Sequence, residues 1–307
     1  MLNIAHRGGA GLLPENTLAA FENAVALGAD GAELDVQLSR DGEVIVFHDY
    51  RLKPEICREN GKWLVSPTPR IKDLTLEELR RFDIGRPAPS TSYAAAHPDL
   101  NPVDGARIPR LSDVIAVAKK ATKNFRLFIE LKTSFSDRAV SASPEALAEA
   151  TIAVLKQTQF MDSAVLVGFD WPGLLHAKKI APEIECWFTT LPQSWFRDAP
   201  PPPEDDPPSP PQLEALRFWA ANGISPWAGG YDAKNYGGSI IKAIHAAGGQ
   251  GWFPMHRDAS AEAIFQAHDL GLKVGAWTVD DASEMRTLIL NGLDAVCTDR
   301  PDILLKL

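Results

Sequence analysis

The residue types best suited to catalysis lie within the first fifty positions of the chain. His6 and Arg7 come first, Glu33 and Asp35 follow in an alternating stretch, and His48 closes the group. The alternation predicts a strand, so both acids should point to the same side of it. Two adjacent carboxylates repel each other unless a cation lies between them, and Mg²⁺ and Ca²⁺ prefer oxygen ligands. Histidines transfer protons and an arginine can bind two phosphate oxygens. Together these residues predict metal-assisted cleavage of a phosphoester.

Glu130 is the third metal ligand that we expect beside Glu33 and Asp35. It lies in the hydrophobic stretch 128–132, where a lone acid would be costly to bury without a partner. Lys132 follows two positions later, so the same alternation places a cation beside the metal site. Two simpler interpretations stay open: a Glu130–Lys132 ion pair at a strand end, and a surface strand whose polar face carries Glu33 and Asp35.

His6 and His48 are predicted to form the general acid–base pair, because imidazole titrates near neutral pH. Each ends an extended segment and has a polar neighbour, Arg7 or Asp49. The sequence leaves open which of them is the acid and which the base. A hydrogen-bonded structural role is the alternative for both. The remaining five histidines lack such neighbours and are expected to be ordinary surface or helix residues: His97, His176, His245, His256 and His268.

Arg7 and Trp277 are the other predicted contacts of a substrate. Arg7 should bind non-bridging phosphate oxygens through its planar fork, with a salt bridge to a carboxylate as the alternative or in addition. Lys132 should act on the same oxygens. Trp277 should form a wall of the substrate pocket, although packing in the core is nearly as good an explanation. Glu15 is expected to support the site from behind, and Asn16 and Thr17 to cap the helix that follows them.

Several motifs in a shared order resemble those of the glycerophosphodiester phosphodiesterases. They are His6-Arg7-Gly8-Gly9, Pro14-Glu15-Asn16-Thr17, Glu33-Leu34-Asp35-Val36, Asp41-Gly42, His48-Asp49, Ile129-Glu130-Leu131-Lys132, Trp277-Thr278-Val279 and Cys297-Thr298-Asp299-Arg300-Pro301. The resemblance covers nearly the whole chain. It implies a (β/α)₈ barrel that uses a divalent metal, Mg²⁺ or Ca²⁺, to hydrolyse a glycerophosphodiester to glycerol 3-phosphate and an alcohol. The stretch 50–57 departs from the family pattern, so the accepted alcohol stays open.

Alternation of strand-like and helix-like segments favours the same α/β barrel, with a doubly wound open sheet as the alternative. One domain over residues 1–307 is expected, with a proline-rich loop at about 198–211. The segment at about 50–111 resembles the small subdomain that this family inserts after its second strand. The segment 200–211 should be extended and exposed. It is either a spacer, a movable rim of the site or a ligand for a partner that binds polyproline helices. The eight expected strands are 2–6, 32–38, 127–131, 164–167, 185–188, 224–227, 274–278 and 295–298, with a short return at 44–47.

Composition narrows the partners of the chain. Apolar residues make up 45% of its 307 residues, enough for one large core, and the net charge of −9 argues against nucleic acid as a partner. Three widely spaced cysteines predict free thiols. There is no apolar stretch long enough for a membrane span and no visible signal peptide, so a cytoplasmic location is expected. A small-molecule diester remains the expected partner, with the oligomeric state open.

Two rival functions use the same residues differently. A lysophospholipase D-like enzyme would cleave longer lipid diesters with the same constellation. A catalytically silent barrel would serve as a scaffold, although the presence of both histidines and all three carboxylates argues against it. The nucleophile also stays open, since water or the glycerol 2-hydroxyl can attack. Proximity favours the hydroxyl and a cyclic phosphate.

Overall fold

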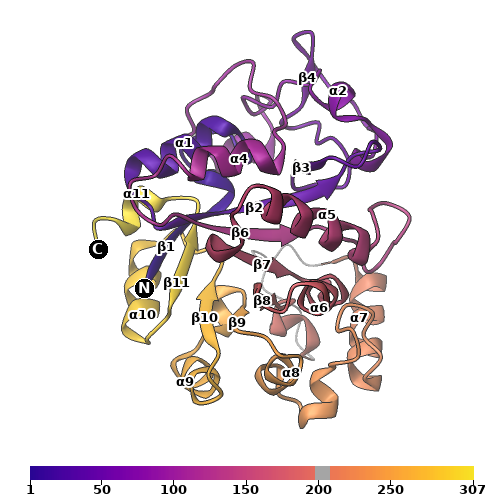
Figure 1. The fold of residues 1–307 in the computed structure, drawn as a ribbon, viewed down its shortest axis with the longest axis vertical. Helices are drawn as coiled ribbons and strands as arrows, with labels where there is room; N and C mark the ends of the chain where they lie inside the picture. The colour runs from indigo at the N-terminus through magenta and orange to yellow at the C-terminus, as the bar shows by residue number, and fades with distance from the viewer. Residues whose placement is uncertain (198–207) are drawn as a thin grey trace.

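Eight parallel strands form a closed barrel in the computed structural model, which describes residues 1–197 and 208–307 (Figure 1). The first strand pairs with both the second and the last, and this closes the barrel. The (β/α)₈ prediction is therefore confirmed, and the open sheet is excluded. The strands are β1 (Leu2–Ala5), β2 (Gly31–Leu38), β6 (Arg126–Leu131), β7 (Ala164–Gly168), β8 (Glu185–Thr189), β9 (Gly251–Phe253), β10 (Lys273–Ala276) and β11 (Ala295–Thr298).

Helices surround the barrel, and their apolar faces bury a continuous core against the strands. The helices are α1 (Leu18–Leu27), α4 (Leu111–Ala118), α5 (Pro144–Gln157), α6 (Trp171–Ile180), α7 (Pro210–Asn222), α8 (Ile240–Ala246), α9 (Ala261–Asp269), α10 (Ala282–Leu290) and α11 (Pro301–Leu304). Short 3₁₀ turns occur at His6–Gly8, Ile71–Asp73, Met161–Ser163, Gln193–Phe196, Ala233–Tyr236 and His256–Asp258. In the described part of the chain, no helix is both long and apolar enough to cross a bilayer.

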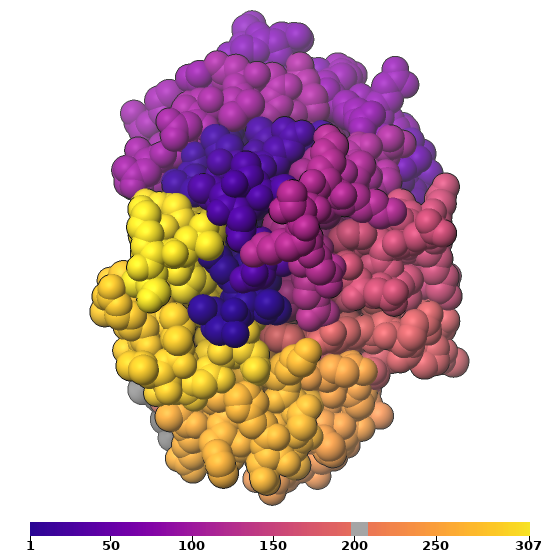
Figure 2. Space-filling view, turned by 60° about the vertical axis from the view of Figure 1, so that its left-hand side comes forward, coloured from indigo at the N-terminus to yellow at the C-terminus, as the bar shows by residue number. Residues whose placement is uncertain are grey.

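The two ends of the chain meet because β1 lies between β2 and β11. Figure 2 shows the N-terminal segment, in indigo, against the yellow C-terminal segment. Register pairs Ala5 with Thr298, so residues that follow each strand emerge at the same rim of the barrel. Residues near the N-terminus can therefore act together with residues near the C-terminus in one site.

Aromatic side chains fill the barrel interior beneath that rim. Phe128, Trp187 and Phe253 contact one another, with ring centroids 5.1 to 6.4 Å apart. All three are buried. They form an apolar layer inside the barrel, and polar groups next to this layer lie in a low-dielectric environment.

One predicted strand is wrong. Residues 224–227 form a turn after α7, and the sixth strand is β9 instead. Pro226 lacks the N–H that a central strand needs. Gly251 opens β9 because a Cβ there would lie 2.4 Å from the ring of Trp187. A glycine-led strand of three residues gives little alternating signal in the sequence.

Residues between the second strand and α4 form small elements above the barrel (Figure 1). They are β3 (Val44–Val46), which runs antiparallel to β2, β4 (Arg58–Glu59), β5 (Lys62–Trp63), α2 (Leu76–Leu79) and α3 (Ser92–Ala96). A second hydrophobic cluster holds them together and is centred on Phe47, Leu52 and Ile71.

The proline-rich stretch is only partly described, since residues 198–207 fall outside the described residues. Its end does not follow the prediction of an extended segment, because Pro210 and Pro211 begin α7. Proline is tolerated in the first turn of a helix, where its missing N–H would have no partner inside the helix. Ser209 caps this helix together with Gln212. The three cysteines are free, as predicted, and all three are buried.

Candidate functional site

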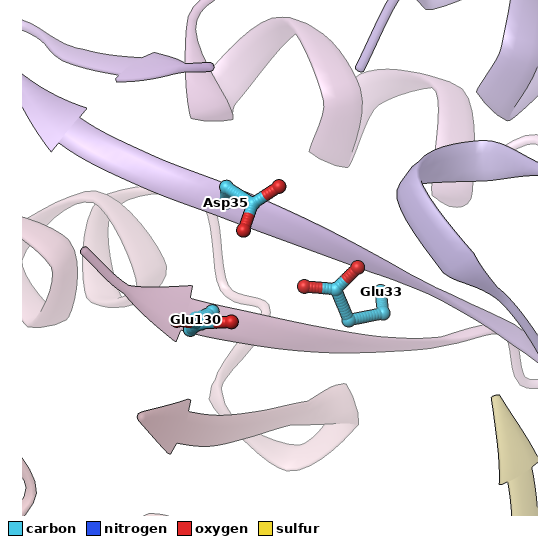
Figure 3. A group of neighbouring side chains, drawn as sticks. All are labelled: Glu33, Asp35 and Glu130. Carbon is cyan, nitrogen blue, oxygen red and sulfur yellow. The ribbon is translucent and has the colours of Figure 1, made fainter. Parts of the chain in front are cut away.

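Three carboxylates meet at the barrel rim, two from β2 and one from β6. Glu33 and Asp35 lie two residues apart on β2, and the register of the strands pairs Asp35 with Glu130 (Figure 3). One oxygen from each carboxylate lies within 4.8 Å of those of the other two. Glu33 and Asp35 are 3% and 1% exposed, so they do not form the polar face of a surface strand. Three hard oxygen donors converging on one point fit the coordination of Mg²⁺ or Ca²⁺.

The charges of these acids show why a cation suits them. Burial, together with the negative charges of Asp35 and Glu130, raises the pKa of Glu33 to about 8. Burial also disfavours ionised Asp35, but electrostatic interactions with His48, Lys132 and Arg7 and the hydrogen bond from Asn16 outweigh it and hold the pKa of Asp35 below its ordinary range. The protein therefore keeps one carboxylate ionised and tends to leave its neighbour protonated. A divalent cation would allow both to ionise.

Lys132 contacts the same cluster from one side. Its Nζ lies 2.9 Å from Glu130 Oε1 and 3.5 Å from Asp35 Oδ1. These contacts outweigh the cost of burial and raise the pKa of Lys132. The Glu130–Lys132 ion pair, which was the simpler interpretation of these residues, is thus present in addition to the acidic cluster. Lys132 remains charged beside the point where a phosphate would approach the three acids.

His6 begins the 3₁₀ turn that follows β1, and Asp299 at the end of β11 orients it. The distance from His6 Nδ1 to Asp299 Oδ1 is 2.7 Å. Burial alone would raise the pKa of Asp299, but the charge of His6 and this hydrogen bond outweigh burial and lower that pKa below its ordinary value. The carboxylate is therefore ionised and can only accept hydrogen bonds. Nδ1 must then carry a proton, and Nε2 faces Glu33 Oε2 at 3.8 Å. Burial opposes the charge of His6, yet Asp299 and Glu33 raise its pKa to about 9.

His48 lies in a very different environment, just after β3. The buried amide of Gln37 donates hydrogen bonds to the carbonyl oxygens of Phe47 and Asp49, at 2.7 and 2.8 Å, and so fixes the backbone around His48. The Nδ1 atom of His48 lies 3.5 Å from Asp49 Oδ2. Burial and the positive charges of Arg7 and Lys132 lower the pKa of His48, against the attraction of Asp35.

Arg7 is held by acids on two sides, so the predicted salt bridge exists. Its Nη1 donates to Glu15 Oε1 at 3.0 Å, and its Nε lies 3.3 Å from Asp35 Oδ2. Glu15 in turn accepts a 2.6 Å hydrogen bond from the hydroxyl of Tyr93 on α3. Arg7 has φ = 49°, a left-handed conformation that turns its backbone N–H toward Glu33 at 3.1 Å. The guanidinium is thereby oriented at the edge of the acidic cluster.

Asn16 does not cap the first helix as expected. Thr17 caps α1 by accepting from the N–H of Ala20, whereas Asn16 has φ = 56° and donates through Nδ2 to Asp35 Oδ2 at 2.8 Å. The left-handed conformation, which asparagine tolerates better than most residues, turns its side chain inward. This hydrogen bond helps to hold Asp35 in place.

Trp277 follows β10 and lines a cavity next to the acids. Its ring contacts Phe169 edge-on with centroids 5.5 Å apart, and its Nε1 donates to the Phe253 carbonyl at 3.0 Å. The cavity measures about 310 Å³ and reaches Glu130 and Lys132. Trp277 therefore packs on the barrel and also forms part of the cavity wall.

Sequence reasoning missed Asp299 and Tyr93, which contact the site only through tertiary structure. Asp299 lies in a quoted motif, Thr298-Asp299-Arg300, but its distance of 293 residues from His6 gave no sign of the pairing. Among the other histidines, His176, His256 and His268 form ion pairs with acids, and His97 bonds the carbonyl of Tyr93. None of these contacts involves the three-carboxylate cluster.

Comparison with known protein families and sequences identifies relatives of this chain. The model of the glycerophosphoryl diester phosphodiesterase family matches residues 6–303. A glycerophosphodiester phosphodiesterase of Caldanaerobacter subterraneus is 28% identical over all of this chain and 97% of its own. One of Bacillus altitudinis is 27% identical over 99% of this chain and 96% of its own.

Solved structures agree in fold. A Silicibacter pomeroyi protein assigned to the glycerophosphoryl diester phosphodiesterases superposes with a TM-score of 0.79 at 28% identity, over 99% of this chain and 92% of that one. An Oleispira antarctica phosphodiesterase, solved with the product sn-glycerol-3-phosphate, has a TM-score of 0.68 at 24% identity, over 99% and 94% of the two chains. The chain therefore belongs to the glycerophosphoryl diester phosphodiesterase family and is a phosphoric diester hydrolase.

Proposed function

We propose that this protein hydrolyses glycerophosphodiesters to sn-glycerol 3-phosphate and an alcohol, with one divalent cation held by Glu33, Asp35 and Glu130. The observation that carries the proposal is the convergence of these three carboxylates within 4.8 Å between two differently charged histidines. When bound, Mg²⁺ or Ca²⁺ would polarise a phosphoryl oxygen and offset the charge that builds up on it. The product found in the Oleispira antarctica phosphodiesterase supports this choice of substrate.

Arg7 and Lys132 bind the remaining phosphate oxygens in this proposal. Arg7 is oriented by Glu15 and Asp35, and Lys132 by Glu130 and Asp35, so both cations are fixed before the substrate arrives. Preorganised charges stabilise a transition state without first reorganising. Both cations also balance the carboxylates, and this allows the negatively charged phosphodiester to approach an acidic site.

His6 is the proton donor and His48 the proton acceptor. A pKa of about 9 keeps His6 protonated at neutral pH, whereas the lowered pKa of His48 keeps it neutral. His48 takes the proton of the attacking hydroxyl as the new P–O bond forms. His6 gives its proton to the leaving alkoxide as the old P–O bond breaks, and the alcohol departs.

The glycerol 2-hydroxyl is the nucleophile that we favour, because a neighbouring hydroxyl has a large proximity advantage over water. Its attack would give a cyclic glycerol phosphate and the free alcohol. Water then opens the ring with the histidine roles reversed, and the net reaction consumes one water. Phosphorus NMR during turnover should detect the cyclic ester, and substrates that lack the 2-hydroxyl should react far more slowly. Equal rates for such substrates would indicate direct attack by water.

Release of glycerol 3-phosphate from glycerophosphocholine tests the function directly. The purified protein is stripped with EDTA and then given Mg²⁺ or Ca²⁺, alongside His6→Ala and Glu33→Gln. Matched controls are His245→Ala and Glu22→Gln, which change the same residue types at exposed positions. We expect metal to restore the activity of the native protein and of both controls, but not of the two site variants.

Failure has a clear meaning in this assay. If no small glycerophosphodiester is hydrolysed with either metal, the proposed reaction is wrong. Activity that survives EDTA and Glu33→Gln would instead refute the metal site while leaving the reaction in place.

A further inference from the structure

We infer that the cavity beside Glu130 and Trp277 receives an aliphatic chain carried by the diester, so that the preferred substrates are short- to medium-chain lipid-like glycerophosphodiesters. This inference rests on the proposed function, because the chain must belong to a molecule whose phosphate lies at the acidic cluster. The reaction is unchanged, since the same P–O bond is hydrolysed.

The cavity adjoins the place where the phosphate would bind. Glu130 and Lys132 line its inner end, and the loops that follow β6, β7 and β8 form its walls. Substrate groups attached to a phosphate at the acids would therefore enter this space directly. The cavity measures about 310 Å³, which is at the lower end of the range for ligand pockets.

Most of its walls are apolar, although Tyr50, Glu130, Lys132 and Thr133 also line it. The main contributors are Phe135, Phe169, Leu191, Trp195, Met255 and Trp277. Burial of methylene groups against such surfaces is favourable by about 0.8 kcal/mol each. A preformed apolar space next to a phosphate site is therefore matched to a substrate with an apolar substituent.

The polar groups of the lining are mostly engaged elsewhere. The hydroxyl of Thr133 donates to Asp170 at 2.6 Å, and Nε1 of Trp277 donates to a carbonyl. Nε1 of Trp195 is buried and has no hydrogen-bond partner among the described residues. Few polar groups of the lining are thus available to a ligand, so a polyol would leave several hydroxyls without partners at a cost of about 1–3 kcal/mol each.

A cationic headgroup could contact the aromatic rings of this lining, but the charges of the lining oppose it. Glu130 is the carboxylate among the described lining residues, and it is already paired with Lys132 and assigned to the metal. A choline or ethanolamine placed there would meet the like charge of Lys132. The chemistry of the walls thus favours an uncharged chain.

The cavity is also held in shape. Phe169 and Trp277 form an edge-on pair, and Phe135 contacts Trp227 with ring centroids 5.3 Å apart. The loop that carries Phe135 is fastened to Asp170 through Arg138 as well as Thr133. A cavity that is rigid before binding loses less conformational entropy when a chain enters.

Two substrate series locate the chain. In one, the glycerol is unmodified and the leaving alcohol grows from methanol to hexanol. In the other, glycerophosphocholine carries acyl groups of two to six carbons, all below micellar concentrations. We expect kcat/KM to rise with length in one series, by up to about fourfold for each methylene that is fully buried. The series that rises shows which end of the diester occupies the cavity.

Phe135→Ser should flatten that rise, since it replaces a wall of the cavity with a polar group. Phe265→Ser is the matched control, because Phe265 is 71% exposed on α9. The ratio of rates for the longest and shortest substrates is the readout. If Phe135→Ser does not fold, the chain-length series on the native protein still decides.

Two outcomes would overturn the inference. One is a kcat/KM that is flat or falls with length in both series, and the other is a length dependence that Phe135→Ser and Phe265→Ser alter equally. Hydrolysis of glycerophosphocholine in the same experiments would show that the proposed function stands even if the inference fails. Absence of hydrolysis for every substrate would refute the function itself.

Discussion

The two histidines flank one acidic cluster but lie in opposite electrostatic environments. His6 is bonded to Asp299 and faces Glu33, so its pKa rises to about 9 although burial opposes the charge. His48 is buried near Arg7 and Lys132, which lower its pKa. The same side chain therefore has a different protonation state on each side of the cluster.

This difference provides an acid and a base at one pH. A proton donor and a proton acceptor work together at neutral pH only if their pKa values are pushed apart. Here the separation arises from the barrel topology, because β11 brings a carboxylate to His6 while the segment after β3 brings His48 close to two cations. The following predictions break or sharpen this contrast.

The largest effect should come from removing each histidine and varying the leaving group. His6→Ala should reduce kcat about 10³-fold for glycerophosphocholine but far less for a p-nitrophenyl diester, because nitrophenolate leaves without a proton. His48→Ala should be impaired with both substrates. Steady-state kinetics measures the ratios, with His245→Ala as the control. Equal losses for both leaving groups in His6→Ala would contradict the assignment of His6 as the acid.

Asp299→Asn should impair proton donation by His6 and leave His48 unaffected. The amide of Asn has no negative charge, so His6 loses its raised pKa and its fixed orientation. As a result, kcat should fall about 10- to 100-fold with little change in KM. The basic limb of the pH–kcat profile should also move to lower pH. Asp269→Asn, at an exposed position on α9, is the control. An unchanged pH profile would show that Asp299 has only a structural role.

Metal binding should release a proton from the acidic cluster. Glu33 has a pKa of about 8 in the metal-free protein, so below that pH a cation must displace its proton, and affinity should fall up to tenfold per pH unit as the pH decreases. Above pH 8 the dependence should vanish. Calorimetry of Mg²⁺ binding in buffers of different ionisation enthalpy counts the protons. Zero proton release at pH 7 would mean that Glu33 is already ionised.

Tyr93→Phe should have the smallest effect. The substitution removes the hydrogen bond to Glu15, while Glu15 still contacts Arg7. Binding of the phosphate by Arg7 should therefore weaken by about 1 kcal/mol, or roughly fivefold in affinity. The loss should appear in KM and in inhibition by glycerol 3-phosphate more than in kcat. Tyr231→Phe, in the segment between α7 and the 3₁₀ turn Ala233–Tyr236, is the control. A loss confined to kcat would argue against a role in orienting Arg7.

Local patterns predicted most of the barrel, and they failed where tertiary contacts override them. Residues 224–227 are mostly apolar but contain Pro226, whereas β9 begins with a glycine that the nearby ring of Trp187 explains. Asn16 has the chemistry of a helix cap, yet it bonds Asp35 because its backbone adopts φ = 56°. Propensity describes what a residue can do near its neighbours in sequence, and a distant partner can offer a better interaction.

The sequence alone determined the residue types of the site and the side of the strand on which they lie, because alternation along a strand follows from local geometry. It could therefore place Glu33 with Asp35, and Glu130 with Lys132. Only the tertiary structure decided that Asp299 would orient His6 and that Tyr93 would support Glu15, over separations of 293 and 78 residues. Such pairings depend on barrel closure and on how the region between β3 and α4 packs, and no local pattern in the chain encodes them.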